Sequence, residues 1–246
     1  MIEIQAGQVF ETNEGGSCTV IAYKNASHVE IKFNDNYGLL AVVRTGDLRR
    51  GKVKNPYHRS VYGVGFIGAG SFKRSVKGRL TREYRVWSGM LARCYRDGTK
   101  QKNPTYVDCT VHKDWHNFQN FAKWITSQDH CDSNYELDKD LLVKGNKLYS
   151  DKTCCLVPAC VNLLIHTSQK KISDLPVGVV MKPNGRFRAY MIKYGSQKYL
   201  GTYDTAEEAS EVYVNHKEDY VKRIAREWQD KISADAFDAL LTWTVY

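Results

Sequence analysis

The chain has 246 residues, 42% hydrophobic and 12% aromatic, and a formal net charge of +9. This composition is typical of a folded protein with room for two or three small domains, and it excludes a disordered chain. No apolar run approaches the roughly 20 residues of a membrane span, no secretion signal opens the chain, and seven cysteines suggest no disulfide framework, so we expect a cytoplasmic protein with reduced thiols.

Residues 1–55 alternate between apolar and polar residues in short bursts such as CTVIAYK and HVEIKF, separated by turns rich in Gly, Asn and Ser. This period of two predicts strands, and a small SH3-like β-barrel is the expected architecture. Residues 56–79 are rich in glycine and lack periodicity. They are predicted to form a linker or a long basic loop that could lie along a DNA groove.

Positive charge is concentrated between Arg44 and Lys100, where 15 Lys or Arg face three acidic residues, giving +12 within 57 residues. Aromatic residues and glycines interleave with these cations, which favours a nucleic-acid surface over the alternative of a solvated basic face. A membrane surface is disfavoured because no basic amphipathic helix is present. The residues expected to contact DNA here are Arg49, Arg50, Lys52, Lys54, Arg59, Lys73, Arg74, Lys77 and Arg79.

Residues 80–170 are predicted to form a central α+β domain with two core-building helices. The first lies in TREYRVWSGMLARCYRD, with Thr81 as its N-cap and Trp87 or Ser88 on its apolar face. The second lies in DWHNFQNFAKWITSQ, with Asp114 as its cap. Both apolar stripes are expected to be structural.

The same region contains YRVWSGMLARCY, YVDCTVHKDWHNFQNFAKW and LDKDLLVKGNKLYS followed by CCLVPACVNLL. These segments resemble the central part of phage proteins grouped with the HNH-type homing endonucleases. An HNH site needs a histidine base and ligands for a divalent ion, but Lys139 stands at the base position. We therefore expect no catalytic residues and a phosphate contact from Lys139. An active site would instead use Mg²⁺ with Asp138, Asp140, Asn146 and Asn162.

A zinc site is a second possible chemistry in this region. Cys109, His112 and His116 lie close in sequence, and Cys131 or the pair Cys154 and Cys155 could complete a ligand set. Zinc sites favour short paired spacings at both ends of a loop, and only one such spacing occurs here. We expect no zinc and no other cofactor.

Residues 175–246 are predicted to form three strands followed by helices. A capping box from Thr205 to Glu208 marks the start of the first helix. Along the second strand, Ala189 and Met191 point to one side, and Arg188 and Tyr190 point to the other. The first set can pack on the helix, which leaves the opposite face of the sheet uncovered.

Residues 176–222 resemble the AP2 DNA-binding domain, most specifically through LGTYDTAEEA. The resemblance implies a three-stranded sheet that reads the major groove. The residues that it implies as base contacts are Lys182, Arg188, Tyr190, Gln197 and Tyr199. Val180 and Ile192 stand where plant members have arginines, so the resemblance predicts no base preference and implies a weaker intrinsic affinity. The alternative is a sheet that only packs on the middle domain.

Together these features predict an α+β protein that binds double-stranded DNA and descends from a phage or phage-satellite homing endonuclease. It is expected to act as a transcriptional repressor in the cytoplasm of a bacterial host, associated with the nucleoid. The alternative is an active HNH-type homing endonuclease or nickase. An RNA-binding or structural adaptor is disfavoured because A-form RNA hides its major groove from a sheet.

Overall fold

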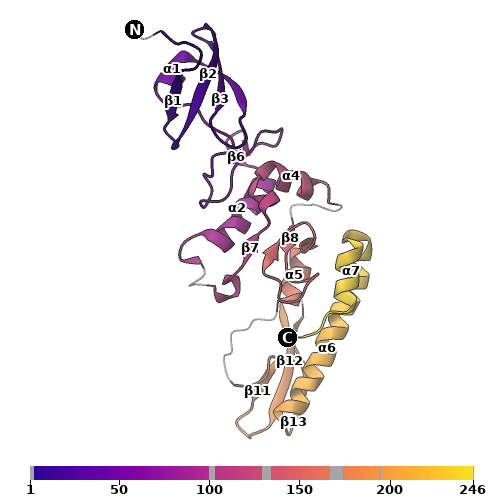
Figure 1. Ribbon diagram of the computed structural model, residues 1–246. Helices are drawn as coiled ribbons and strands as arrows, with labels where there is room; N and C mark the ends of the chain where they lie inside the picture. Colours follow the sequence, from indigo (N-terminus) through magenta and orange to yellow (C-terminus); the bar gives the residue numbers. More distant parts are fainter. Residues whose placement is uncertain (1–2, 100–102, 129–133, 167–173, 194, 246) are drawn as a thin grey trace. The chain divides into compact units, whose positions relative to one another are not determined.

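The computed structural model describes residues 3–99, 103–128, 134–166, 174–193 and 195–245, which form helices and several small antiparallel sheets (Figure 1). This confirms the predicted mixture of helices and antiparallel strands. Two compact units are present, residues 1–102 with 113–123 and residues 103–112 with 124–246, so the predicted central domain is divided between them. Within the described ranges, none of the helices combines the length and hydropathy of a membrane span.

The first unit begins with a four-stranded antiparallel meander in the order β1-β2-β3-β4 (Figure 1). The strands are β1 (Val9–Thr12), β2 (Gly16–Asn25), β3 (His28–Phe33) and β4 (Leu40–Val43), followed by helix α1 (Thr45–Arg49). Alternate residues of β2 and β3 are buried and pack with side chains from outside the sheet. This core consists of Ile4, Cys18, Val20, Val29, Ile31, Phe33, Leu48 and Val53.

Residues 56–79, hereafter the strap, contain little regular structure beyond the start of a short hairpin, β5 (Ser75–Val76) with β6 (Arg79–Leu80). The strap is nevertheless anchored to its own unit, unlike a free linker. The side chain of Gln119, only 9% exposed, accepts a hydrogen bond from the N–H of Phe72 at 3.0 Å. Its Nε2 donates to the carbonyls of Ile67 at 3.2 Å and Phe72 at 3.0 Å. The Gln119 side chain therefore satisfies backbone groups of the strap, in addition to the backbone hydrogen bonds that Phe66 forms with His116 and Phe118.

Glycine is required in the strap because protein side chains lie against it. A Cβ at Gly68 would overlap the side chain of Asn117, and one at Gly70 would overlap Gln119. The backbone of Gly68 also has a φ of 73°, which a side chain would strain. At these two positions glycine therefore lets the backbone lie close to side chains of the protein itself, and not to DNA.

Helix α2 (Arg82–Tyr95) starts as predicted, since the Thr81 hydroxyl accepts a hydrogen bond from the N–H of Tyr84 at 3.3 Å. Trp87, rather than Ser88, is fully buried, and its Nε1 donates to the carbonyl of Trp115 at 2.7 Å. The side chains that α2 buries are Tyr84, Trp87, Met90, Leu91 and Cys94.

Helix α4 (Phe118–Thr126) follows the 3₁₀ turn η2 (Lys113–His116), and the predicted cap Asp114 lies inside that turn. Asn117 takes the capping role instead, because its Oδ1 accepts from the N–H of Gln119 at 3.0 Å. The prediction of Asp114 as the cap was wrong by three residues, since the 3₁₀ turn delays the start of the helix.

The second unit contains the 3₁₀ turn η1 (Pro104–Tyr106) and a ββα arrangement. Strand β8 (Tyr135–Asp138) pairs antiparallel with β10 (Cys155–Pro158), and helix α5 (Ala159–Ile165) follows at once. In the sequence between β8 and β10 lies a further strand, β9 (Leu148–Tyr149), which pairs in parallel with β7 (Thr110–Val111) in a separate two-stranded sheet. Strand β8 ends at Asp138, so it is shorter than the YELDKDLLV segment suggests.

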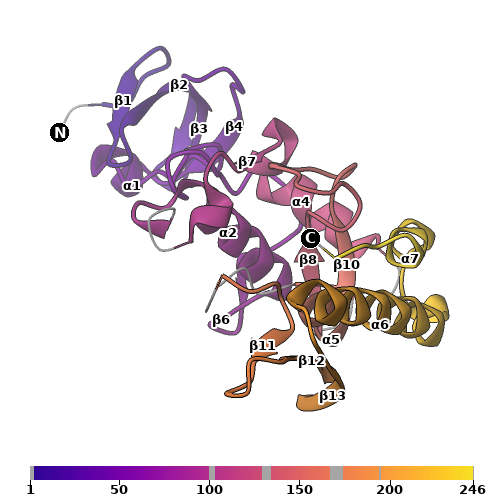
Figure 2. The same cartoon turned by 90° about the horizontal axis from the view of Figure 1, so that it is seen from below.

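The C-terminal part of this unit is an antiparallel sheet in the order β11-β12-β13 with helix α6 along it (Figure 2). The strands are β11 (Val179–Met181), β12 (Phe187–Lys193) and β13 (Ser196–Tyr203), followed by α6 (Ala206–Glu227), the turn η3 (Gln229–Lys231) and α7 (Ala234–Leu241). The predicted capping box of Thr205 and Glu208 is confirmed. Val179, Ala189 and Ala209 form the centre of the contact between sheet and helix.

The anchoring of the strap leads to a stability prediction. Replacing Gln119 with Ala removes three hydrogen bonds, and we expect the free energy of unfolding to fall by about 1–3 kcal/mol. The loosened backbone of the strap should also be cleaved faster by trypsin after Lys73 and Arg74, so limited proteolysis followed by mass spectrometry measures the effect. Asn120→Ala, an exposed neighbour on α4, is the control. Equal cleavage of both variants would contradict the anchoring role.

Candidate functional site

One face of the β11-β12-β13 sheet is covered by α6, and the other face carries the predicted base contacts. Ala189 and Met191 are 0% and 4% exposed on the covered side. On the opposite side, Arg188 pairs with Val180 and with Thr202, and Tyr190 pairs with Tyr199. Gln197 pairs with Ile192, and the N–H of Lys182 donates to the carbonyl of Arg186 at 2.8 Å. The register therefore brings Lys182, Arg188, Tyr190, Gln197 and Tyr199 to one face.

A β-bulge makes this arrangement possible. Ala189 pairs with Gly201, but the next residue, Tyr190, pairs with Tyr199, so Leu200 is an extra residue in β13. Leu200 packs against the core under the sheet, while Tyr199 is 61% exposed. Because the side-chain period of a strand is two, a regular ladder would have put Tyr199 beside Met191 on the covered face.

The uncovered face is partly organised by its own contacts. The guanidinium of Arg188 lies 5.9 Å from the centroid of the Tyr190 ring. The Nε of Arg188 is buried and finds no hydrogen-bond acceptor among the described residues. Arg186 differs, because its Nε forms an ion pair with Asp204 at 2.8 Å. Arg188 thus retains donor capacity that Arg186 has already used within the protein.

The nine predicted backbone-contacting residues of the first unit, from Arg49 to Arg79, are all exposed. Arg50 forms an exposed ion pair with Asp47 at 3.1 Å, and the guanidinium of Arg74 lies 5.1 Å from the Tyr84 ring centroid. Lys77 and Gly78, both with positive φ, form the two-residue turn between β5 and β6. This hairpin presents basic side chains at its tip.

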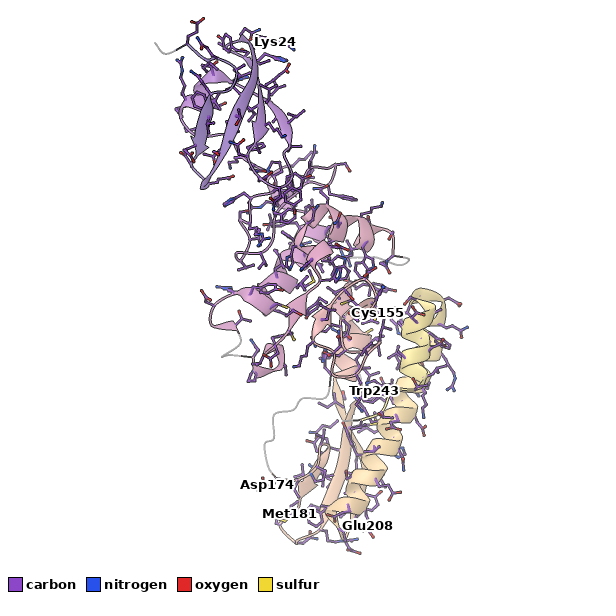
Figure 3. The ribbon with its side chains drawn as sticks, in the orientation of Figure 1. Lys24, Cys155, Asp174, Met181, Glu208 and Trp243 are labelled. Carbon is purple, nitrogen blue, oxygen red and sulfur yellow. The ribbon has the colours of Figure 1, made fainter. Side chains whose placement is uncertain are left out.

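The second unit also contains a pocket of about 570 Å³ beside the end of β8. Trp243, labelled in Figure 3, lines it from the segment that follows α7. The polar residues that line it are Thr105, Tyr106, Asp138, Lys139, Asp140, Lys147 and His166.

Asp138 ends β8 by turning the backbone. Its Oδ1 accepts hydrogen bonds from the N–H groups of Asp140 at 2.8 Å and Leu141 at 2.6 Å. Asp140 therefore lies beyond the strand in a turn, and the expectation that the two carboxylates share one strand face was wrong. A short polar side chain that captures backbone N–H groups two and three residues ahead favours a turn over an extended strand.

Lys139 is buried, with 6% exposure, and its ammonium is fully used. Its Nζ donates to both carboxylate oxygens of Asp140 at 2.6 and 2.7 Å and to the carbonyl of Asn146 at 2.7 Å. An ammonium has three N–H donors, so none is left for the phosphate contact expected of Lys139. That expectation is corrected: Lys139 neutralises Asp140 and fixes the loop.

Asn146 supports the same loop. Its Nδ2 donates to the carbonyls of Lys139 at 2.9 Å and Leu148 at 2.6 Å, and its Oδ1 accepts from the N–H of Leu148. Asn162 lies in α5, is 8% exposed, and donates to Glu136 Oε2 at 2.6 Å. Oδ1 of Asn162 is buried without a hydrogen-bond donor among the described residues. Neither asparagine lines the pocket that Asp138 and Asp140 line, so the predicted set of four catalytic residues does not assemble as one site.

His166, which the sequence interpretation missed, is brought to Asp138 instead. It caps the C-terminal end of α5, and its Nε2 lies 3.6 Å from Oδ2 of Asp138. The imidazole is 58% exposed and lines the pocket. His166 follows Asn162 by four residues, which is about one helical turn. This spacing could have indicated that both residues lie on the same side of α5, and so could have identified His166 as a candidate.

Burial raises the pKa of Asp138, although the N–H groups of Leu141 and Asp140 oppose the shift. The negative charge of Asp140 raises it further, and His166 lowers it. Burial also raises the pKa of Cys154 to about 12 and shifts Cys155 in the same direction, so both thiols are neutral at pH 7. Neutral buried thiols behave as small apolar side chains.

The remaining zinc candidates are scattered. Cys109 is buried, with its Sγ 3.6 Å from the carbonyl of Thr105, while His112 is exposed and His116 packs edge-on against Tyr95. Cys131 lies outside the described residues. Across the described part of the chain, His, Cys, Asp and Glu side chains form no group of three or more that could hold a metal.

The pocket offers two donors to a divalent ion, Oδ2 of Asp138 and Nε2 of His166. Both oxygens of Asp140 are already bound to Lys139. A hard cation such as Mg²⁺ prefers six oxygen ligands, whereas imidazole suits Zn²⁺ better. The residues therefore fit a weakly held ion completed by water or phosphate.

Asp138 provides a test in which hydrogen bonding and charge are separated. Asp138→Ala leaves two backbone N–H groups without their acceptor and should lower the free energy of unfolding by about 2–4 kcal/mol. Asp138→Asn keeps an oxygen acceptor and removes the buried charge, so it should be at least as stable as the wild type at pH 8.

The raised pKa fixes the direction of the pH dependence. Below the unfolded-state pKa of about 4, the Asp138 carboxyl is protonated in both the folded and the unfolded state, and its stabilising contribution to the free energy of unfolding is complete. This contribution is lost as the pH rises through the raised pKa of Asp138 in the folded state. Denaturant titrations in EDTA between pH 4 and 8 should show this loss in the wild type and in Asp151→Asn, an exposed control. The pH dependence should be smaller in Asp138→Asn; an identical pH profile would contradict the burial effect.

Comparisons of the chain with protein-family models, with curated proteins and with solved structures gave no match.

Proposed function

We propose that this protein binds double-stranded DNA through the uncovered face of the β11-β12-β13 sheet. The observation that carries the proposal is the separation of the two faces: α6 covers one, and the five predicted base contacts share the other. Arginine can form bidentate hydrogen bonds with guanine in the major groove, and the major groove admits a β-ribbon. The resemblance to the AP2 domain supports the same role.

The basic residues from Arg49 to Arg79 would add affinity that does not depend on sequence. Their exposure supports this, because a cation that keeps its hydration in the free protein is available to replace counterions on DNA. Base contacts on the sheet would then select the site, and phosphate contacts would strengthen binding at any site.

We further propose that the protein acts by occupying DNA, as a transcriptional repressor derived from a homing endonuclease in a bacterial cytoplasm. The contacts of Lys139 support a role without cleavage. Lys139 stands at the position of the histidine base, and its ammonium binds both oxygens of Asp140. The nuclease alternative would need this carboxylate to hold a divalent ion. A repressor that acts by occupying a promoter needs only to bind DNA and does not need to cleave it.

Cleavage is a second candidate function, and the contact between Asp138 and His166 favours it. Oδ2 of Asp138 and Nε2 of His166 would hold a divalent ion, which would supply Lewis-acid activation of a phosphodiester. Lys147 lies at the same pocket and could position a phosphate. This arrangement would use a histidine from the end of α5 instead of one beside Asp138.

Base reading is tested on a duplex selected from a random pool by the wild-type protein. Arg188→Ala or Tyr199→Ala should weaken binding to the selected duplex by about 1–3 kcal/mol and should affect random duplexes much less. Lys198→Ala is the matched control, because Lys198 is also exposed on β13 but pairs with the buried Met191. Fluorescence anisotropy gives the affinities. Equal losses on both DNAs would show that these residues do not read bases.

Cleavage is tested by incubating the selected duplex with Mg²⁺ or Mn²⁺ and scoring the gel shift and strand breaks together. We expect a shifted and intact duplex with either ion. Ion-dependent breaks that disappear in His166→Ala and Asp138→Asn would establish the nuclease and remove the repressor proposal. Breaks that persist in both variants would point to a contaminating nuclease.

A further inference from the structure

An aromatic stack in the first unit joins the meander to the strap. The rings of Tyr37 and Tyr57 are parallel, with centroids 4.0 Å apart and an interplanar angle of 8°. Phe66, only 6% exposed, lies 5.7 Å from each of them at a tilt. Tyr37 is nevertheless 56% exposed. Because Tyr57 covers one face of the Tyr37 ring, its exposed area belongs to the opposite face and the edge.

Hydrogen bonds fix both tyrosines in place. Oδ1 of Asp35 accepts from the N–H groups of Tyr37 at 2.9 Å and Gly38 at 2.8 Å. Oδ2 of Asp35 accepts from Nδ2 of Asn55 at 2.7 Å, and Oδ1 of Asn55 accepts from the N–H of Tyr57 at 2.9 Å. Burial alone would raise the pKa of Asp35, but these donors hold it below its ordinary value. The exposed ring therefore sits on a preorganised base.

Cations lie on both sides of this stack along the chain. The side chain of Lys32 packs against Gly38, the residue after Tyr37, closely enough that a Cβ there would meet its Cε at 2.9 Å. Lys54 and Arg59 are exposed and flank Asn55 and Tyr57 in the sequence. Two carboxylates are also close: Asp35 and Glu14 accept hydrogen bonds from Asn55, which is a neutral donor, so both keep their negative charge. Three cations against two carboxylates leave a small net positive charge around the stack.

We propose that the Tyr37–Tyr57 stack binds an unpaired nucleobase of a single-stranded nucleic acid, with Lys32, Lys54 and Arg59 contacting the adjacent phosphates. A rigid aromatic face beside cations is the recurring design of sites that hold single strands, because every base has a face that can stack. A purely structural stack would gain more from burying Tyr37 than from presenting it to water. This site goes beyond the proposed duplex reading, and it rests on that proposal only in treating the chain as a nucleic-acid-binding protein.

The test uses the full-length protein and a 12-nucleotide single strand that contains 2-aminopurine. Stacking on Tyr37 should change the 2-aminopurine fluorescence, and Tyr37→Ala should weaken binding about 5- to 100-fold. Tyr37→Trp retains an aromatic face and should bind within a few-fold of the wild type. Tyr23→Ala is the control, since Tyr23 is 45% exposed on strand β2 of the meander and has no stacked partner among the described residues. Matched DNA and RNA strands show which source of bases is preferred.

Equal binding of both strands by wild type and Tyr37→Ala would overturn the inference, as would a Tyr37→Trp variant that binds no better than Tyr37→Ala. An arm with the selected duplex separates this outcome from the fate of the proposed function. Arg188→Ala should lose duplex specificity and keep the single-strand signal. A wild-type protein that binds the single strand through Tyr37 and binds no duplex would refute the duplex proposal and leave this site intact.

Discussion

Each sheet in the described part of the chain has at most four strands, so none can bury its core without cover from elsewhere. Leu48 of α1 and Val53 pack on the buried face of the meander, and the β11-β12-β13 sheet is covered by α6. A small sheet covered on one face leaves the other face to water. This constraint is the reason that the candidate interface is a sheet surface.

The loop after β8 shows what a buried charge requires of its neighbours. An ammonium removed from water is stable only when its donors are matched, and Lys139 obtains this match from a carboxylate and a carbonyl within seven residues of sequence. The same contacts occupy both carboxylate oxygens of Asp140. The side chain of Asn146 is held separately, by the backbone of Lys139 and Leu148.

Local features of the fold could be predicted from the sequence. The strands of the first 55 residues follow from alternation, and the starts of α2 and α6 follow from Thr81 and from the Thr205–Glu208 box, because these signals depend on neighbours within four residues. The start of α4 at Phe118 could not be placed, because the intervening 3₁₀ turn shares the same residue types.

Features that depend on distant partners were not predictable in this way. Phe72 is anchored by Gln119, which lies 47 residues away in the sequence. His166 reaches Asp138 only because β10, which precedes α5, pairs with β8. From the sequence, Gln197 and Tyr199 are predicted to share one face with Arg188, but the bulge at Leu200 that brings both of them to that face has no signature in a single sequence. Composition likewise could not show whether the glycines of the strap approach DNA or protein.

Because β13 contains an extra residue, the number of residues in this strand determines which face each side chain occupies, independently of which residues they are. Leu200 acts as a spacer: residues before it and after it alternate out of phase with one another. Loss of one residue there would restore a regular ladder and turn Gln197 and Tyr199 towards α6 without changing any of their identities. Among relatives of this chain, a deletion at this point would therefore alter the proposed contact surface more than most substitutions on it, and an alignment that slides a gap past Leu200 would compare side chains from opposite faces.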